Sequence, residues 1–335
     1  ATIYVSATFA GSITAILINT PGTSAAAATT FDGYPLAQKG EAGRALGIAV
    51  ISSTVGGIFS VIILCFAAPL LARVAYEFRS PEYFALTVFG LSMLASISAG
   101  GAVKNLIGGI FGVWLSTIGA ERVTGIERFM FGNYELYEGL HFVPIFIGLF
   151  AISELLVQSK TVNKIINTVT MKAVKLPTIE DYKKIWKTIL RSCGIGTFIG
   201  VLPAEGATVA SMIGYSEARR WSKNKKEFGK GAIEGIAGAE AANNAATGGA
   251  MVPTMVLGIP GSGTTAIILV GLMVHGLRPG VYLFTEQVEK VYQIFGSMFV
   301  ANVMFMLMGL YAAKLFARVS LVPTQILWPI VFALS

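Results

Sequence analysis

Two uncharged segments of the sequence combine proline and glycine with several hydroxyl side chains. They are Thr20-Pro21-Gly22-Thr23-Ser24 and Pro260-Gly261-Ser262-Gly263-Thr264-Thr265. Proline and glycine interrupt helices, so each segment is expected to start a half-helix whose first turn carries the hydroxyls. A helix N-terminus offers free N–H groups and a partial positive charge, and each such interaction with an anion is worth about 0.3–2 kcal/mol. Both segments are therefore predicted to bind the carboxylate groups of a ligand. The alternative is a kinked helix that packs closely through small residues.

Three asparagines offer amide groups in apolar surroundings. Asn243 and Asn244 lie in an acid-poor run of small residues, and Asn19 comes just before the first Pro-Gly segment. Side-chain amides at such places either bind a ligand or a sodium ion, together with backbone carbonyls, or join helices by hydrogen bonds. The sequence leaves both interpretations open.

The elements that must position these residues are membrane helices. The chain has 335 residues, of which 54% are hydrophobic and only 13% charged, with a net charge of +7. Soluble domains carry about 25% charged residues, so a soluble enzyme is excluded, and so is a disordered chain, which would be rich in charge. No Walker-type phosphate loop occurs, and neither the cysteines nor the histidines have partners at metal-ligand spacing. We therefore expect no cofactor and no resident metal.

Charge-free runs mark the expected spans, since a bilayer core needs about 20 apolar residues as a helix. These runs are 45–72, 83–103, 291–313, 319–335 and the longer 241–277. The last run is too long for one helix, and breaks are expected in it at Gly248-Gly249, at Pro253 and at residues 258–263. Unwound backbone at membrane depth survives only inside protein or beside a wet cavity, so this run is expected to contribute to a site.

Basic residues indicate the orientation. Lysine and arginine concentrate in residues 159–191 and 217–230, which the positive-inside rule places in the cytoplasm. The segment 192–216 between them must then enter and leave on one face, so a re-entrant hairpin is predicted, with its turn near residues 202–206. Few aromatic residues accompany the basic ones, so no nucleic-acid partner is expected, whereas membrane lipids are. Lys104 separates two uncharged runs, and we expect it to lie at an interface with its charge in water. Asp32 and Lys39 are expected in a polar loop beside the first Pro-Gly segment, as gate or loop residues.

Two parts of the chain resemble each other. Leu17–Ser24 aligns with Val256–Gly263 at an offset of 239 residues, and Leu70–Ala75 aligns with Leu315–Ser320 at an offset of 245. The tracing of spans puts the corresponding loops on opposite faces, as an inverted repeat requires. The predicted organisation is a first repeat over residues 1–158, a basic cytoplasmic linker over 159–191, and a second repeat over 192–335. Both repeats lack counterparts at one end, so the sequence is expected to be part of a longer chain.

At these segments the sequence resembles the TctA family, the large membrane subunit of bacterial tripartite tricarboxylate transporters. The stretches that carry the resemblance are residues 11–46 with LINTPGTS, residues 123–156 with ERFMFGNYELYEGLHF, and residues 229–280 with AGAEAANNAATGGAMVPTMVLGIPGSGTT. The resemblance implies a multi-pass secondary carrier in the bacterial inner membrane. Such carriers take up di- or tricarboxylates that a periplasmic solute-binding protein delivers, together with a small second membrane subunit. A cation gradient is expected to drive uptake, with Na⁺ as the first expectation and H⁺ as the other.

One departure from the family pattern lies at the predicted hairpin. The family usually reads Leu-Pro-Gly-x-Gly-Ala-Thr, whereas this chain has Ala204 and Glu205 between Pro203 and Gly206. Ala204 removes a glycine that would let backbone approach a ligand closely. Either this tip binds the coupling cation or a proton, through Glu205, Gly206 and Thr208, or the substrate differs from a citrate-like acid.

The sequence thus predicts an all-α polytopic membrane protein with inverted repeats, broken helices and a re-entrant hairpin. The predicted function is cation-coupled uptake of organic carboxylates, and no enzyme activity is expected. One alternative is a carrier of another anion or an amino acid on a similar scaffold. An intramembrane enzyme is a weaker alternative because neither histidine has an identifiable nucleophile partner, and a purely structural subunit would not need two Pro-Gly breaks.

Overall fold

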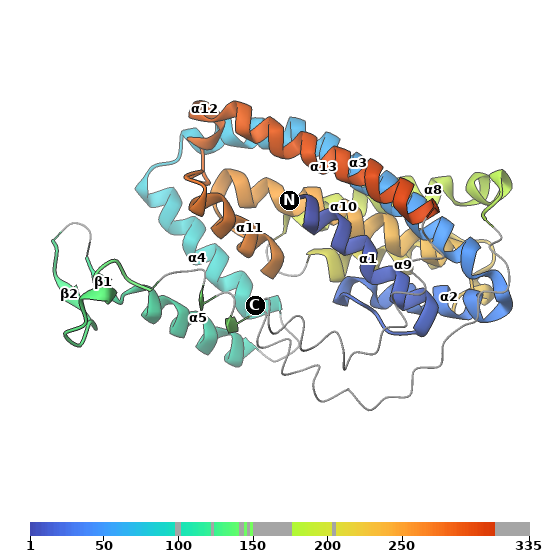
Figure 1. The fold of residues 1–335 in the computed structure, drawn as a ribbon, viewed down its shortest axis with the longest axis horizontal. Coiled ribbons are helices and arrows are strands. Elements are labelled where there is room, and N and C mark those ends of the chain that lie inside the picture. The colour runs from blue at the N-terminus through green and yellow to red at the C-terminus, as the bar shows by residue number, and fades with distance from the viewer. Residues whose placement is uncertain are drawn as a thin grey trace. The chain divides into compact units, whose positions relative to one another are not determined.

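The computed structural model describes residues 1–97, 102–121, 124–140, 144–145, 148–149, 176–202 and 206–311. The chain divides into two compact units, one formed by residues 1–77 and 165–322 and the other by residues 78–164 and 323–335. Each unit is described by itself. The described residues are mostly helical, and the strands among them form one short ribbon, so the all-α prediction is confirmed (Figure 1).

The first unit holds all the predicted site residues. Its elements are α1 (Thr2–Ile18), the 3₁₀ turn η1 (Ser24–Ala26), α2 (Ala27–Leu36), the π-helical turn η2 (Ala37–Glu41), α3 (Ala42–Tyr76), α8 (Ile179–Val201), α9 (Gly206–Trp221), the 3₁₀ turn η5 (Lys225–Glu227), α10 (Ile233–Leu257), α11 (Gly263–Val274), α12 (Leu283–Glu286) and α13 (Val288–Tyr311).

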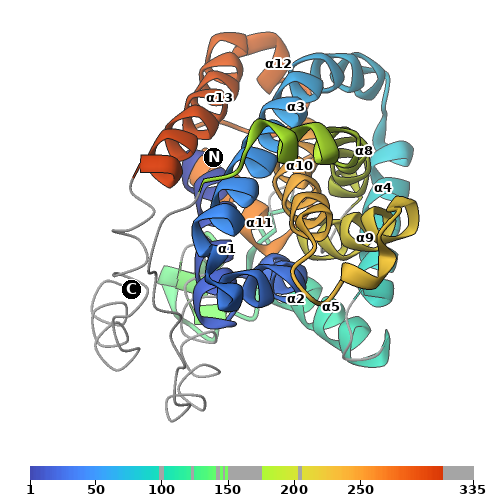
Figure 2. The ribbon, with the colours of Figure 1, turned by 90° about the vertical axis from the view of Figure 1, so that its right-hand side faces the viewer.

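Helix α10 is the centre of this unit. Every residue from Gly235 to Val256 is buried, and α3, α8 and α9 pack around it (Figure 2). Small residues permit the close approach, because a Cβ on Gly56 of α3 would lie 2.2 Å from the Ala241 carbonyl oxygen. A Cβ on Gly196 of α8 would likewise lie 2.2 Å from the Ala242 carbonyl oxygen. Almost any side chain at these two positions would push the helices apart. The glycines therefore allow α3 and α8 to pack directly against α10.

Several polar side chains are buried among the apolar core residues of this unit, and many large apolar side chains are exposed. Glu240, Asn243 and Asn244 are 0% exposed, whereas Phe66 is 75% and Leu70 64% exposed. Buried polar groups and exposed large apolar side chains are both uncommon in proteins that are surrounded by water. Two helical stretches among the described residues, 24–76 and 288–311, are long and apolar enough to cross a bilayer. The exterior of the unit is therefore suited to lipid.

The second unit contains α4 (Ser80–Ile97), α5 (Ala102–Ser116), the 3₁₀ turn η3 (Tyr134–Leu136) and a short antiparallel ribbon. In that ribbon, β1 (Gly119–Ala120) pairs with β2 (Glu127–Arg128). Lys104 is exposed in the first turn of α5. The expected turn at Gly100-Gly101 lies outside the described residues.

Two expectations about local structure are corrected. Helix α10 continues without a break through Gly248-Gly249 and Pro253, and the uncharged run is interrupted only after Leu257. The glycines serve close packing instead, because a Cβ on Gly248 would lie 2.5 Å from the Ser60 hydroxyl oxygen and one on Gly249 would lie 2.3 Å from the Thr197 carbonyl oxygen. The residues expected as a loop around Asp32 are helical, in α2 and η2.

Candidate functional site

The first Pro-Gly segment ends α1 and folds back on it. Asn19 adopts the left-handed conformation, with φ of 54°, and its N–H donates to the Thr14 carbonyl oxygen. The Thr20 N–H is directed at the same carbonyl at 3.4 Å. An asparagine tolerates this conformation better than most residues, which explains its place at a helix end. The structure therefore gives Asn19 a backbone role in terminating α1.

Gly22 is the point where the returning chain touches α1. Its N–H donates to the Gly11 carbonyl oxygen at 3.0 Å, and a Cβ on Gly22 would lie 2.8 Å from the Gly11 Cα. The next residue, Thr23, is extended, and η1 begins at Ser24. The Thr23 hydroxyl is buried and has no hydrogen-bond partner in the described part of the chain. Pro21 and Ser24 on either side are exposed, so a ligand can reach this turn.

The second Pro-Gly segment ends α10 in the same manner. Gly258 is left-handed, with φ of 68°, and its N–H donates to the Pro253 carbonyl oxygen. The Ile259 N–H is directed at the same carbonyl at 3.3 Å. Gly261 then packs against Ala250, because a Cβ there would lie 2.9 Å from the Ala250 Cβ.

A capping box starts α11 directly after this turn. Ser262 is extended and accepts the Thr265 N–H on its hydroxyl, while the Ser262 N–H donates to the Thr265 hydroxyl at 2.8 Å. The Gly261 N–H is directed at the Thr254 hydroxyl at 3.3 Å. The two serine and threonine hydroxyls at this helix start are therefore engaged with each other's backbone, whereas Pro260 and Thr264 are exposed. A capping box satisfies two donors at the start of the new helix and so stabilises it.

The backbone of the two breaks repeats at the offset of 239 residues. The acceptor Thr14 corresponds to Pro253, the left-handed Asn19 to Gly258, and Gly22 to Gly261. The packing partners correspond as well, Gly11 to Ala250. The backbone of the two segments is therefore alike at these aligned positions, while the division into two repeats stays a prediction. The second alignment, at an offset of 245, ends on residues outside the described ones, and the opposite orientation of the repeats in the membrane stays a prediction.

The predicted hairpin meets the first break. Helices α8 and α9 pack side by side, and a Cβ on Gly206 would lie 3.0 Å from the Gly200 Cα. The hydroxyls of Thr208 and Ser24 lie 2.9 Å apart. A residue predicted for substrate and one predicted for the coupling ion are thus brought together. Glu205 and the rest of the hairpin tip, residues 203–205, lie outside the described residues.

Asn243 and Asn244 are completely buried, and none of their side-chain oxygens and nitrogens has a partner in the described part of the chain. Helical spacing separates their directions. Asn243 shares a side of α10 with Ala250 and Thr254, which contact Gly261 of the second break. Asn244 stands between Glu240 and Gly248, which contact Ser53 and Ser60 of α3. Buried amides without partners are costly, so both positions are suited to an additional ligand or water.

Glu240 is a site residue that the sequence reasoning missed. Its carboxylate is fully buried and accepts hydrogen bonds from Ser12, Thr29 and Ser53. Glu240 directly precedes the uncharged run 241–277, so the search for charge-free runs treats it as the end of a run and gives it no role of its own. The small residues on both sides of it, AGAEAANNAA, were the available signal.

Asp32 has a structural role. It is fully buried, and one carboxylate oxygen accepts the N–H groups of Gly229, Gly231 and Ala232, each at 2.8 Å. These amides immediately precede α10. Asp32 therefore fixes the entry to the central helix and takes up the positive end of its dipole.

An ion pair joins the starts of α3 and α8. Arg44 donates to both carboxylate oxygens of Asp181, at 3.0 and 2.6 Å, and also to Glu41 at 2.6 Å. The Arg44 guanidinium lowers the pKa of the Asp181 carboxyl below its usual value, and the Thr178 amide adds to the effect. This bidentate pair fixes α8, which leads into the predicted hairpin, to α3.

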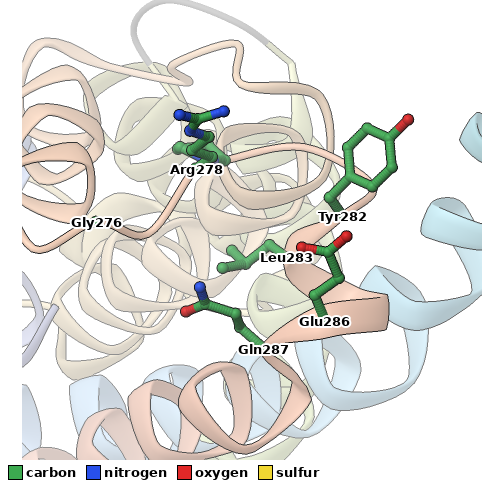
Figure 3. A pocket seen from close by; sticks show the side chains of 7 residues that line it. Gly276, Arg278, Tyr282, Leu283, Glu286 and Gln287 are labelled. Carbon is green, nitrogen blue, oxygen red and sulfur yellow. The ribbon is translucent and has the colours of Figure 1, made fainter.

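A surface hollow of about 370 Å³ lies beyond the end of α11, where α12 begins. Figure 3 shows Arg278, Tyr282 and Glu286 around it. None of the predicted site residues is among those that line it. One positive side chain, Arg278, and one negative side chain, Glu286, line the hollow. The hollow therefore has no excess positive charge that would bind a multivalent carboxylate.

Comparison with known proteins decides the family. The model of the tripartite tricarboxylate transporter TctA family matches residues 1–335, the whole sequence given. The chain belongs to the TctA family. This TctA chain is 38% identical over 340 residues to an uncharacterized 52.8 kDa protein of the TAR-I ttuC' 3' region of Agrobacterium vitis. That match covers 99% of the chain and 66% of the relative.

A second relative of this TctA chain comes from the TAR-II ttuC' 3' region of the same organism. It is 37% identical over 140 residues, which cover 41% of the chain and 58% of the relative. The chain thus spans about two thirds or less of the length of these relatives. No solved structure matches. Family membership and the apolar exterior together make this TctA chain a membrane protein of a transporter family, which agrees with the predicted fold.

Proposed function

We propose that this chain is the substrate-translocating part of a secondary carrier for di- and tricarboxylates. In this proposal it crosses the bacterial inner membrane several times and imports its substrate against a gradient by cotransport of a cation. A periplasmic solute-binding protein delivers the substrate, and a small membrane subunit completes the carrier. The TctA family supports a role in tripartite tricarboxylate transport, and the cation, the substrate and the partners of this chain are inferred.

The observation that carries the proposal is the pair of equivalent helix breaks. Each combines a left-handed helix end, a glycine folded against the preceding helix, and a new helical turn with hydroxyls at its start. Carboxylates are bound well by the N–H groups of such turns, and two turns supply more favourable interactions than one. Broken helices from two repeats are also where secondary transporters place their substrate.

The environment of the breaks supports the same role. Asn243 lies on the side of α10 that contacts the second break, and its amide has no partner in the described part of the chain. Ser24 of the first break contacts Thr208 of the hairpin. In the proposal, the carboxylate groups are bound by the turns at Ser24 and Gly263, and Asn243 binds a polar group between them.

Uptake into proteoliposomes tests the function. The full-length protein, with its small subunit and binding protein, is reconstituted and given labelled citrate or succinate, with a sodium gradient, a pH gradient, or neither. We expect accumulation of at least one acid that requires one of the gradients, with the label recovered unchanged. Accumulation of amino acids or inorganic anions instead would favour another carrier class, and chemical conversion of the label would indicate an enzyme.

A further inference from the structure

We propose that Glu240 is a proton-binding site of this carrier, where one proton is loaded and released during each transport cycle. The inference rests on the proposed function and specifies its coupling ion as a proton at this residue. It starts from the placement of Glu240 in the most enclosed helix of the unit, where the carboxyl group is 0% exposed.

The partners of Glu240 are three hydroxyl groups from three different helices. Ser12 of α1 donates to one carboxylate oxygen at 2.5 Å, and Thr29 of α2 donates to the same oxygen. Ser53 of α3 donates to the other oxygen at 2.7 Å. All three donors are buried as well. The site is therefore assembled from separate parts of the fold and closed to bulk water.

Arginine or lysine does not neutralise this carboxylate, since no ion pair in the described part of the chain includes Glu240. The other ionisable groups on the packed elements have different partners or places. Asp32 of α2 accepts from amides before α10, and Arg44 of α3 binds Asp181. Arg191 of α8 stacks on Trp221, and Tyr215 of α9 contacts two phenylalanine rings. Tyr4 of α1 lies two turns before Ser12. An unpaired buried carboxylate is costly, so a bound cation or proton must accompany it in part of the cycle.

The geometry favours a proton over a metal ion. The 2.5 and 2.7 Å distances from the Ser12 and Ser53 hydroxyls to the carboxylate are those of direct O–H···O hydrogen bonds, which leave no space for a cation between the oxygens. A hydroxyl group both donates and accepts. The three partners can therefore donate to the ionised carboxylate and, after rotation of one hydroxyl, accept from the protonated acid. A lysine or arginine partner would instead hold the group ionised.

The position of the donors connects this site to the first break. Ser12 is next to Gly11, on which Gly22 folds back, and Thr29 lies in α2 just after η1. The carboxylate thus links the chain before the break to the chain after it. Protonation removes the charge that attracts both hydroxyls and weakens this link, whereas release of the proton to water on the other face restores it. Proton occupancy therefore changes the conformational freedom of a substrate-binding turn, which is what coupling requires.

The test compares Glu240→Gln with the wild type in the full transporter. Glutamine has the size of protonated glutamate and can neither gain nor lose the proton. We expect this variant to lose accumulation of labelled citrate or succinate driven by a pH gradient, while exchange of internal for external substrate persists. The matched control is Glu234→Gln, on the same helix but bonded to Ser222 outside the cluster, and it should accumulate substrate as the wild type does. Accumulation by Glu240→Gln driven by the pH gradient would overturn the proposal.

Two further measurements keep the inference separate from the proposed function. Infrared difference spectra of the reconstituted protein, taken between acid and alkaline pH without substrate, should contain a carboxyl band that Glu240→Gln lacks and Glu234→Gln retains. Absence of such a band would overturn the proton site even if carboxylate uptake is found, and its presence would support the site even if the substrate is another anion. Ser53→Ala removes one donor to the ionised form, so the pH profile of uptake should move toward higher pH. An unchanged profile would contradict the role of the cluster.

Discussion

Gly22 donates its backbone N–H to the carbonyl oxygen of Gly11, eleven residues before it, at a distance of 3.0 Å. The contact fixes the returning chain against α1 and sets the direction in which η1 begins. Gly261 takes the equivalent place beside Ala250 after α10. Both breaks therefore depend on a glycine that packs closely against the preceding helix.

Adding one carbon at these glycines should disable the site. In Gly22→Ala and Gly261→Ala, the Cβ would lie 2.8 and 2.9 Å from its neighbours, so the turn must move, at a cost of about 1–3 kcal/mol. We expect uptake to be lost while the protein still inserts into the membrane at normal levels. Gly194→Ala is the matched control, because a Cβ there meets nothing within 4 Å. Normal uptake by Gly22→Ala would contradict a binding role for the first break.

The contact between Ser24 and Thr208 predicts coupling between the first break and the hairpin. A double-mutant cycle with Ser24→Ala and Thr208→Val should show an interaction free energy of about 0.5–1.5 kcal/mol in substrate affinity. The reason is that the hydroxyls, 2.9 Å apart, lose the same hydrogen bond in either single variant. Substrate-dependent thermal stabilisation of the purified protein measures the affinity. Additive effects would show that the two hydroxyls act independently.

Sequence reasoning predicted the breaks because proline and glycine change backbone conformation locally. Asn19 and Gly258 end their helices in the left-handed conformation, as residues of these types do. The same reasoning was wrong at Gly248-Gly249, because a glycine pair fits a closely packed helix as well as a broken one. Whether such a pair breaks a helix or packs within one depends on its tertiary neighbours. Here these are Ser60 and Thr197, which are distant in the sequence.

The partners of Glu240 and Asp32 could not be predicted for the same reason. Ser12, Thr29 and Ser53 are ordinary hydroxyl residues in apolar helices, and only the packing of α1, α2 and α3 on α10 brings them to one carboxylate. Asp32 looked like a loop residue because the sequence does not show the three amides that surround it. Local backbone conformation could thus be predicted from residue types, whereas the hydrogen bonds of the buried polar side chains depend on tertiary packing.

The Arg44–Asp181 pair predicts a pH dependence of stability. The pKa of Asp181 is lowered in the folded state, chiefly by Arg44, so the ionised acid stabilises the fold above its usual unfolded value of about 3.9. That contribution disappears as the pH falls through the lower folded value. Because Arg44 is partly exposed, solvent screening limits the contribution to about 1 kcal/mol. Asp181→Asn should lower the unfolding temperature at neutral pH and reduce its decline in acid. Glu180→Gln, at an exposed neighbouring position, should behave like the wild type.

Asp32 should keep the turn before α10 in a fixed conformation. Removing a charged acceptor of three amides by Asp32→Ala should cost about 1.5–3 kcal/mol or more, whereas Asp32→Asn keeps one acceptor oxygen and should cost less. We expect faster tryptic cleavage in the basic segment 219–230 in the order Ala, Asn, wild type. Glu180→Gln, which changes an exposed acid on α8, serves as the control. Equal cleavage rates in all four proteins would show that Asp32 does not hold this segment.

Asn243 and Asn244 should differ, although they are adjacent and equally buried. Asn243 lies on the side of α10 that contacts Gly261, so Asn243→Ala should weaken substrate binding by about 1–2 kcal/mol, which is roughly a tenfold loss of affinity. Asn244 faces α3 between Glu240 and Gly248, away from the second break, so Asn244→Ala should leave substrate affinity close to that of the wild type. Titration of purified variants with citrate and succinate, followed by thermal stabilisation, separates the two. A loss of affinity confined to Asn244→Ala would place the substrate on the α3 side of α10 and contradict the site proposed between the breaks.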